Sequence, residues 1–443
     1  MSPRHTRRRF VSWMLASPLC ATALRAYALT AEARITDFGA RPDATTVNTK
    51  AIQAAIDQLA ATGGGTVVVP AGIFVSGALF FKPRVNLRLE RGAVLRCSTD
   101  MVNFPAQRTR IEGHFEEKFN PALINVSACD GFTLSGEGML DGAGRPIWDE
   151  FWRRRNAVAD PHNFPNLSVA RARLAFIERS QNVRIDGITF HDSQFWNLHL
   201  YHCQQVLVRN VRFEVPDDYK QAPSTDGIDV DSSQDVTIDG CFFSVTDDCI
   251  AAKGTKGLHA LDDTDSPPVE RLHIRNCTYK RGNGVLTLGS EATIVRHVTV
   301  EDCKVIGDVK VAVLKLRPDT PQHYEDIHFR NIALEGSGNG AQILAIQPWS
   351  QYAVKAENPP QSVVRNVSLT GIRGRIGSFG TIRPNLGQTL IEDILLKDFD
   401  VTLKNDKLAA TDVKHLRFEN VIVNGKPYTS DAITASKPTK PDW

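Results

Sequence analysis

The sequence has a single apolar run of note, and that run lies near the N-terminus. It ends at Leu24 and is shorter than the about 20 apolar residues that a membrane-spanning helix requires. Farther along the chain we find no other candidate, so we expect no membrane span. An uncleaved anchor at the N-terminus is the alternative, and the shortness of the run disfavours it.

The residues around this run have the pattern of an export signal. The segment Thr6-Arg7-Arg8-Arg9-Phe10-Val11 precedes it, and the small residues of Ala26-Tyr27-Ala28 follow as a cleavage site. An arginine pair followed by a phenylalanine is typical of twin-arginine signals. We therefore predict that residues 1–28 are a twin-arginine-type signal peptide and that the mature protein is periplasmic or extracellular.

The chain also lacks a strong charge of either sign. Its 52 basic and 50 acidic residues give a net charge of +2. Residues 1–28 hold five basic and no acidic residues, so the mature chain has 47 basic and 50 acidic residues and a net charge of −3. A uniformly basic surface for nucleic acid is thereby excluded, and we expect no nucleic-acid partner. Attraction for an anionic ligand would have to be local.

Linkers and low-complexity segments are missing from residue 31 to the end of the chain. Length alone would suggest two or three domains. A solenoid, however, grows along one axis without dividing. We therefore predict one domain over residues 29–443, and we expect it to be a monomer.

A short repeat runs through the second half of the chain. Its template is apolar-x-apolar-x-(Gly/Asn/Asp)-apolar, and successive copies are offset by 23, 30, 36, 26, 29, 40, 27 and 22 residues. The copies begin at Val183, Val206, Val236, Leu272, Val298, Ile327, Val367, Ile394 and Leu416. Alternating strands with small polar turns at this spacing are typical of a parallel β-solenoid, in which stacked coils share one core.

The cysteines are few and show no metal-binding pattern. No Cys-x-x-Cys and no Cys/His cluster occurs, so we expect no metal and no cofactor. Cys241, Cys277 and Cys303 occupy one template position, where Ile188 and Val211 stand in other copies. That position faces the core, which indicates buried thiols acting as small hydrophobic side chains.

A segment with helical rather than strand periodicity precedes the repeats. Residues 48–61 place Ala51, Ile52, Ala55, Ile56 and Leu59 at helical spacing, and a run of three glycines follows. Residues 66–70 then read as a strand. We predict a helix that caps the open N-terminal end of the solenoid and covers its strand edges.

Three acidic residues are unusual in their spacing. Asp226 and Asp248 are 22 residues apart, Asp247 adjoins Asp248, and Ile228 and Ile250 share the same offset. A chain that coils about once per offset stacks these carboxylates, which raises their pKa values and gives the fold no benefit. Cleavage of a glycosidic bond does require one protonated and one ionised carboxyl group.

The positions of two of these residues conflict with a regular strand. Asp226 and Asp248 share strand parity with Ile228 and Ile250, which should point inward. We therefore expect the chain to bend just before both isoleucines. Gly227 favours such a bend, whereas Cys249 does not.

The motifs resemble those of a known family. The start of the chain (ITDFGA from residue 35 and GGGTVVVPAG from residue 63) looks like that of pectin-degrading β-helix enzymes. Residues 224–254 resemble the polygalacturonase family, glycoside hydrolase family 28, and the similarity extends from about residue 34 to 420. The resemblance implies an all-β, single-stranded, right-handed parallel β-helix that hydrolyses α-glycosidic bonds of pectic polysaccharide with inversion.

The same resemblance implies a role for each aspartate. Asp247 would be the general acid, while Asp226 and Asp248 would together activate water. An inverting reaction needs its acid and base about 6.5–9.5 Å apart to admit that water. Residues on neighbouring coils, about 4.8 Å apart, fall near this range.

Four further residues are predicted to bind substrate. Asn283 stands where the family usually has a histidine between two glycines, and Lys315-Leu316-Arg317 replaces its usual Arg-x-Lys. We expect Lys315 and Arg317 to face outward and hold a uronate carboxylate. Trp196 would either stack on a sugar ring or fill a turn. Because Asn283, Lys315 and Arg317 depart from the family pattern, galacturonan and rhamnogalacturonan both remain as substrates.

The segment 145–171 is predicted to be a long loop that walls the cleft. Two other functions are compatible with a β-solenoid. One is pectate-lyase-type elimination, which is disfavoured because the acidic cluster matches the hydrolase motifs and the sequence shows no comparable set of calcium ligands. The other is a non-catalytic, glycan-binding solenoid.

Overall fold

The structure is a computed structural model and describes residues 31–337, 340–352, 354 and 358–435. The predicted signal peptide, residues 1–28, lies outside the described residues. From Ala31 onward the described chain forms one compact unit. Within the described ranges no helix is long and apolar enough to cross a membrane.

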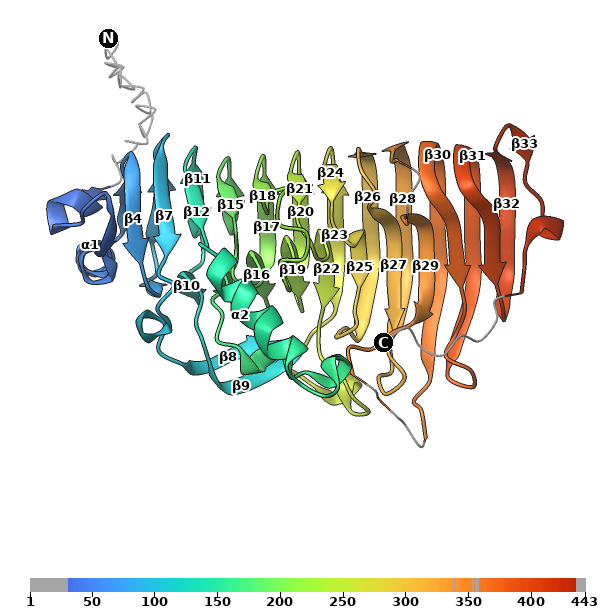
Figure 1. Ribbon diagram of the computed structural model, residues 1–443, viewed down its shortest axis with the longest axis horizontal. Helices are drawn as coiled ribbons and strands as arrows, with labels where there is room; N and C mark the ends of the chain where they lie inside the picture. Colours follow the sequence, from blue (N-terminus) through green and yellow to red (C-terminus); the bar gives the residue numbers. More distant parts are fainter. Residues whose placement is uncertain (1–30, 338–339, 353, 355–357, 436–443) are drawn as a thin grey trace, which may run out of the picture. The chain divides into compact units, whose positions relative to one another are not determined.

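The described chain is a right-handed parallel β-helix, as the sequence predicts (Figure 1). One sheet of 31 strands winds through the molecule, and each strand pairs with its counterpart on the next coil. Three strand ladders, which we call the first, second and third faces, run along the solenoid.

The first face carries the repeat template. Its strands are β1 (Glu32–Arg34), β3 (Gly65–Val69), β6 (Val85–Leu89), β11 (Thr133–Gly136), β14 (Arg184–Asp186), β17 (Gln204–Arg209), β20 (Gln234–Asp239), β23 (Val269–Arg275), β26 (Ile294–Val305), β28 (His323–Glu335), β30 (Ser362–Ile382), β31 (Thr389–Ala410) and β32 (Val413–Val423). The strands from β26 on are long and continue onto the second face, and β30 and β31 also reach the third. From Val206 to Leu416, each template residue is the direct partner of the next copy.

The second face follows a tight turn in each coil. Its strands are β2 (Asp43–Val47), β4 (Gly72–Ser76), β7 (Ala93–Cys97), β12 (Met139–Asp141), β15 (Thr189–His191), β18 (Arg212–Glu214), β21 (Phe242–Ser244) and β24 (Thr278–Arg281). The Gly/Asn/Asp position of all nine template copies lies in this turn with φ between 52 and 81°, for example Asn210 at 54° and Gly187 at 81°. Only glycine, asparagine and aspartate adopt this left-handed conformation readily, which explains the template.

The third face completes each coil. Its strands are β5 (Leu79–Phe81), β10 (Ile124–Ser127), β13 (Ala175–Glu178), β16 (Leu198–Tyr201), β19 (Ile228–Asp231), β22 (Ile250–Lys253), β25 (Gly284–Leu288), β27 (Lys310–Leu316) and β29 (Gln342–Pro348). Two pairs lie outside the three ladders: the hairpin β8 (Gln107–Ile111) and β9 (His114–Phe119), and β33 (Lys426–Pro427), which pairs antiparallel with β32.

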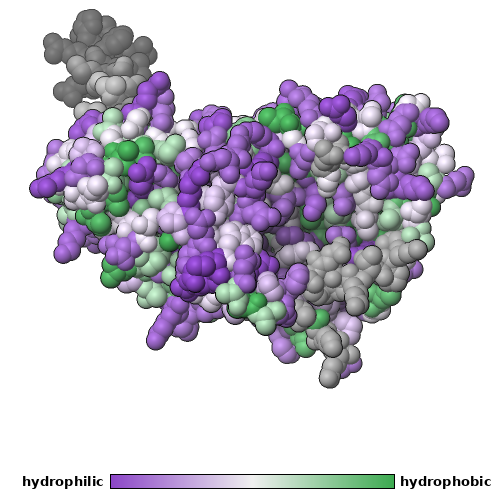
Figure 2. All heavy atoms as spheres, in the orientation of Figure 1, coloured by the Kyte–Doolittle hydropathy of each residue, from purple (hydrophilic) through white to green (hydrophobic). Residues whose placement is uncertain are grey.

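The interior is a continuous stack of like side chains. Phe190, Phe213, Phe243 and Tyr279 stack ring on ring from coil to coil, with centroids 5.0–5.1 Å apart. All seven cysteines of the described chain are free and buried, as expected for thiols that act as core side chains. Hydrophobic residues on the face seen in Figure 2 are scattered among hydrophilic ones, because each strand turns its apolar side chains inward.

A helix covers the N-terminal end of the solenoid. α1 (Thr49–Ala61) buries Ile52, Ala55, Ile56 and Leu59, which confirms the predicted cap. The segment 145–171, predicted as a loop, instead contains α2 (Arg145–Asn156), which lies against the outside of the coils (Figure 1). The prediction of a loop was wrong because only Trp148 and Phe151 of this short helix are buried, so its apolar face is too sparse to show a helical period.

Candidate active site

The chain bends before two successive strands of the third face and so brings the acidic residues to the surface of the solenoid. β19 begins at Ile228 and β22 at Ile250, and these two isoleucines are direct partners. Gly227 and Cys249 form the bends, and the Gly227 amide donates to the Asp248 carbonyl at 2.9 Å. The predicted bends are therefore present, and the preceding aspartates lie outside the strands.

Glycines on both sides make the bends possible. A Cβ at Gly227 would approach the Cys249 carbonyl oxygen to 2.4 Å, and one at Gly282 would approach the Cys249 sulfur to 2.3 Å. Such contacts do not occur in folded proteins, so both positions require glycine. Cys249 fits its bend because its side chain fills the space that Gly282 leaves.

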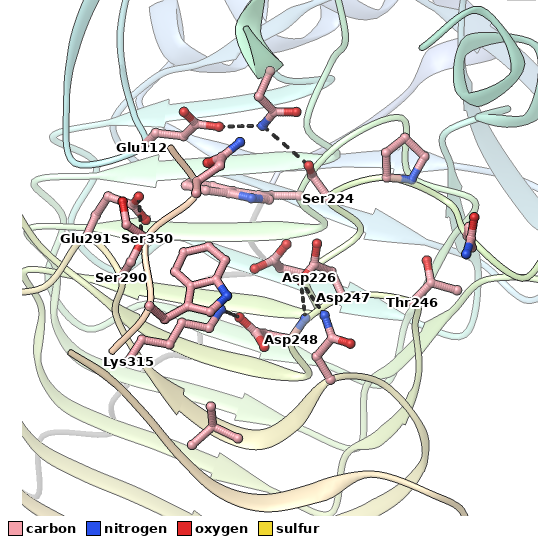
Figure 3. A pocket seen from close by; sticks show the side chains of 18 of the residues that line it. Glu112, Ser224, Asp226, Thr246, Asp247, Asp248, Ser290, Glu291, Lys315 and Ser350 are labelled. Carbon is pink, nitrogen blue, oxygen red and sulfur yellow. Dashed lines mark hydrogen bonds and ion pairs between the residues drawn. The ribbon is translucent and has the colours of Figure 1, made fainter. Parts of the chain in front are cut away.

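Asp226, Asp247 and Asp248 converge on one point (Figure 3). Each offers a carboxylate oxygen within 4.8 Å of the other two. Asp226 and Asp248 are only 3% and 1% exposed, whereas Asp247 is partly exposed. Three carboxyl groups at this spacing cannot all be ionised at low cost in free energy.

Asp248 is held in its ionised form. Lys315 Nζ lies 2.8 Å from its Oδ2, and the Thr287 hydroxyl donates to its Oδ1 at 2.8 Å. Burial alone would raise the pKa of Asp248, but Lys315 and Lys253 outweigh this effect and lower it below the ordinary value.

The Asp226 carboxyl group lies close to a buried lysine. Lys253 Nζ lies 3.8 Å from Asp226, 3.7 Å from Asp229 and 3.8 Å from Glu291, without a shorter contact to any of them. Burial, followed by repulsion from Asp247, raises the pKa of Asp226 well above its ordinary value. The group therefore tends to hold a proton.

Asp247 is the most exposed of the three acids. Its Oδ1 accepts hydrogen bonds from the Asn283 side chain at 3.0 Å and from the Asp248 amide at 3.0 Å. Burial and the neighbouring Asp248 charge raise its pKa despite these bonds. The predicted register of Asn283 with Asp247 is correct, since the two residues also share a backbone hydrogen bond of 2.9 Å.

The acidic residues line a cavity of about 750 Å³. Three tryptophans border it, namely Trp152, Trp196 and Trp349, and Figure 3 shows the acids at its centre. Its lysines are Lys220, Lys253, Lys310 and Lys315. A concave site with aromatic walls and converging charged groups suits a sugar polymer with anionic residues.

Trp196 fills a turn, which is one of the two roles expected of it, and it also lines the cavity. It is nearly buried, stacks on Phe195 at 5.4 Å between centroids and fills the bend before β16. Its ring also borders the cavity and lies 4.9 Å from the Lys253 ammonium. The indole thus packs against the Lys253 ammonium group, which also lies close to Asp226.

Lys315 and Arg317 are not the solvent-facing pair that we expected. Lys315 lines the cavity, but its ammonium contacts Asp248 and lies 4.4 Å from the centre of the Trp349 ring. Arg317 is only 6% exposed and pairs with Asp319 at 2.6 Å. Arg317 is also absent from the residues that line the cavity. The strand ends at Leu316, so the alternation used for the prediction does not extend to Arg317.

The segment 145–171 walls the cavity, although it does so as a helix. Phe151, Trp152 and Arg155 from α2 line the cavity together with His162 and Asn166. The Asn166 amide donates to the Tyr352 hydroxyl at 3.1 Å and its side chain donates to Glu112. These contacts join three segments that are far apart in sequence.

Sequence reasoning missed Lys253, Glu291, Glu112, Lys310 and Trp349. Only Lys253 carried a signal, since it ends the strand that follows the Asp247–Asp248 pair. The others come from later coils or from the β8–β9 turn. The three aspartates are also close enough to hold a cation, but lysine ammonium groups already contact Asp248 and Asp226.

Comparisons with known proteins show the family of the chain. The family model for glycosyl hydrolases family 28 matches residues 96–425, and one described as rhamnogalacturonase A/epimerase, pectate lyase-like, matches residues 33–87. An exopolygalacturonase of Zea mays is 26% identical over 353 residues, which cover 77% of this chain and 76% of that protein. A probable polygalacturonase of Vitis vinifera is 26% identical over 313 residues, which cover 68% of this chain and 60% of that protein.

A solved structure shares the fold. The exopolygalacturonase of Thermotoga maritima superposes with a TM-score of 0.70 at 22% identity, covering 90% of this chain and 93% of that one. The family model spans most of this chain, including all three aspartates and Asn283. The chain therefore belongs to glycosyl hydrolases family 28 and is a polygalacturonase-like glycoside hydrolase.

Proposed function

We propose that this chain hydrolyses the α-glycosidic bonds of galacturonan or rhamnogalacturonan, using Asp226, Asp247 and Asp248 as its catalytic residues. The observation that carries the proposal is the convergence of these carboxylates, within 4.8 Å, in a cavity bordered by tryptophans and lysines. Because their surroundings differ, each of the three carboxylates has a different role.

Asp247 is the general acid of this proposal. It is the partly exposed member of the three and has a raised pKa, so it keeps a proton that a substrate can reach. As the glycosidic bond breaks, this proton passes to the leaving oxygen. Asn283 orients the carboxyl group through its hydrogen bond to Oδ1.

Asp248 is the base, and Asp226 helps to hold the water. The Lys315 contact keeps Asp248 ionised, so it takes a proton from the water that attacks the anomeric carbon. Water supplies the new C–O bond and the acid supplies the proton of the new hydroxyl. A proton transferred from Asp248 to Asp247 then restores the starting state.

The compactness of the acidic group bears on stereochemistry. Each carboxylate has an oxygen within 4.8 Å of the other two, whereas the separations of about 6.5–9.5 Å for inverting and about 5–5.5 Å for retaining enzymes are measured between whole carboxyl groups. Inversion therefore rests on the family resemblance and on the pair of carboxylates that can hold one water. The anomer first released decides between the two outcomes.

We propose Lys310 as the residue that binds a uronate carboxylate. Lys315 and Arg317 already pair with Asp248 and Asp319. Lys310 lines the same cavity, and its ammonium makes no hydrogen bond or ion pair with the described residues. Burial lowers its pKa, and an anionic substrate would raise it by favouring the charged form.

We further propose that cleavage occurs at chain ends. The contacts of Asn166 with Tyr352 and Glu112, and of Thr255 with the Gly113 carbonyl at 3.1 Å, join four segments beside the cavity, which Glu112 and Asn166 line. A polymer that meets such a barrier enters by its terminus. Relatives in Zea mays and Thermotoga maritima are named exopolygalacturonases.

We also propose that residues 1–28 export the protein, which then acts as a monomer outside the cytoplasm. The arginine-rich start of the chain and its short apolar run support this. Fusion of residues 1–28 to a reporter tests export, and replacement of Arg7, Arg8 and Arg9 by lysine should block it. Light scattering of the purified protein tests the monomer.

Digestion of a panel of homogalacturonan and rhamnogalacturonan fragments tests the function. We expect saturated products one or two sugars long, with little early loss of polymer length. Unsaturated products would instead establish elimination. Binding without release of reducing sugar would establish a glycan-binding solenoid.

A further inference from the structure

A second cluster of ionisable side chains lies outside the active site, where two adjacent coils end on the second face. Asp141 closes β12 and His191 closes β15, and the two residues are direct partners in the parallel ladder. Asp192 follows His191 at once. The three residues offer ligand atoms within 4.8 Å of one another.

Two atoms of this cluster are buried without a hydrogen-bond partner among the described residues. They are Asp192 Oδ1 and His191 Nδ1. Asp192 as a whole is only 7% exposed. A buried carboxylate oxygen without a partner costs free energy, so its persistence indicates a group that satisfies it.

The spacing of these atoms fits a metal ion better than a direct bond. His191 Nδ1 lies 3.5 Å from Asp192 Oδ1 and 3.8 Å from Asp141 Oδ1, and both distances are too long for good hydrogen bonds. A point equidistant from the three atoms would lie about 2–2.4 Å from each of them, close to the length of Zn–N and Zn–O bonds.

We propose that Asp141, His191 and Asp192 bind a divalent cation of the zinc type. Two carboxylates and one neutral imidazole supply the charge and the nitrogen ligand that such a cation prefers. The His191 side chain is 30% exposed, so the cluster lies close to the protein surface although His191 Nδ1 and Asp192 Oδ1 are themselves buried.

Neighbouring groups hold the ligands in place. Arg96 Nε donates to Asp141 Oδ2 at 2.7 Å, and the Ala143 amide donates to Asp141 Oδ1 at 2.9 Å. Hydrogen bonds of this kind orient metal-binding carboxylates. Glu214 partners His191 on the next coil and adds negative charge, while the charge of nearby Arg145 is paired with Asp218 at 2.6 Å.

The site joins α2 to the solenoid. The Asp192 carbonyl accepts from the Gly144 amide at 2.9 Å, directly before α2, and Trp148 of α2 donates to the Ser193 carbonyl at 3.0 Å. A cation that links β12 to β15 would therefore stabilise the base of the helix that walls the cavity (Figure 1).

Titration of zinc chloride into the whole metal-free protein, followed by calorimetry, tests the proposal. We expect one zinc ion per chain and a zinc-dependent rise in Tm. His191→Ala and Asp192→Asn should each weaken binding at least tenfold and remove the rise in Tm. His191→Gln serves as a second variant if the alanine variant does not fold.

Asp226, Asp247 and Asp248 also lie close together and are a competing candidate for zinc binding, so a control variant in the active site is required. Asp226→Asn should bind zinc as tightly as the wild type, and anomalous scattering from a zinc-soaked crystal should place the ion beside His191. The proposal is overturned by absence of binding, by binding that survives His191→Ala, or by binding that is lost in Asp226→Asn. Failure of the glycoside hydrolase assay would leave these results unchanged.

Discussion

Asp248 differs from its two acidic neighbours in the lysine that it contacts. Its pKa is lowered because Lys315 and Lys253 outweigh burial, whereas burial dominates for Asp226 and Asp247 and raises theirs. One carboxylate and at least one carboxylic acid therefore coexist over a range of pH. This is the condition that acid–base cleavage of a glycosidic bond requires.

The acid role of Asp247 predicts a loss of turnover. Asp247→Asn removes the proton that the leaving oxygen receives, so kcat should fall by about 10²–10⁴-fold. Steady-state kinetics on the best pectic fragment measures this. The circular dichroism spectrum should not change, because Asp247 is partly exposed; a loss of structure would mean that the residue serves the fold.

The Lys315 contact predicts a pH effect with a defined sign. Asp248 acts as a base in its ionised form, and Lys315 lowers its pKa. Lys315→Met should therefore raise that pKa and move the acidic limb of the kcat/KM profile to higher pH. An unmoved limb with a lower plateau would show that Lys315 only binds substrate.

Lys310 predicts a change in substrate affinity. Lys310→Ala should raise KM for uronate-containing fragments about tenfold, since a hydrogen bond to a charged group contributes about 1.5–3 kcal/mol. Lys280→Ala is the matched control, because Lys280 is exposed, pairs with Asp217 and does not line the cavity. Equal KM values for the two variants would show that Lys310 does not bind the substrate.

At the scale of the element, the turns before β19 and β22 explain why the acids are available at all. A regular strand would bury Asp226 and Asp248 in the core. The chain instead bends at Gly227 and Cys249, and each strand starts only at the isoleucine that follows. The catalytic geometry therefore depends on the backbone bends at Gly227 and Cys249.

Gly227→Ala tests this dependence. The added Cβ would approach the Cys249 carbonyl oxygen to 2.4 Å, so the bend must shift and Asp226 with it. We expect a lower Tm and a loss of kcat. Gly254→Ala is the control, since its added Cβ would meet its neighbours at 3.4 Å or more; equal effects of the two substitutions would contradict this explanation.

At the scale of the whole molecule, the sequence predicts the solenoid well because its period is carried by local chemistry. A left-handed turn residue and alternating apolar positions recur in every copy, and the copies then align as direct partners. The stacked aspartates and the register of Asn283 follow from the same period. Contacts between residues on distant coils do not follow from this period.

The remaining features arise from groups that only the folded chain brings together. Lys253 lies among three acids, all of them from the two neighbouring coils, and Arg317 pairs with Asp319 just after its strand has ended. The helix α2 is stabilised by packing against the coils rather than by its own period. Such features have no repeated signal in the sequence.

The most direct measurement is proton NMR of the first products released from homogalacturonan and rhamnogalacturonan fragments by the wild type and by Asp247→Asn. We predict a saturated product whose anomeric configuration is inverted, and almost no product from the variant. Release of an unsaturated uronide, or equal release by both proteins, would contradict the assignment of Asp226, Asp247 and Asp248 as the hydrolytic residues.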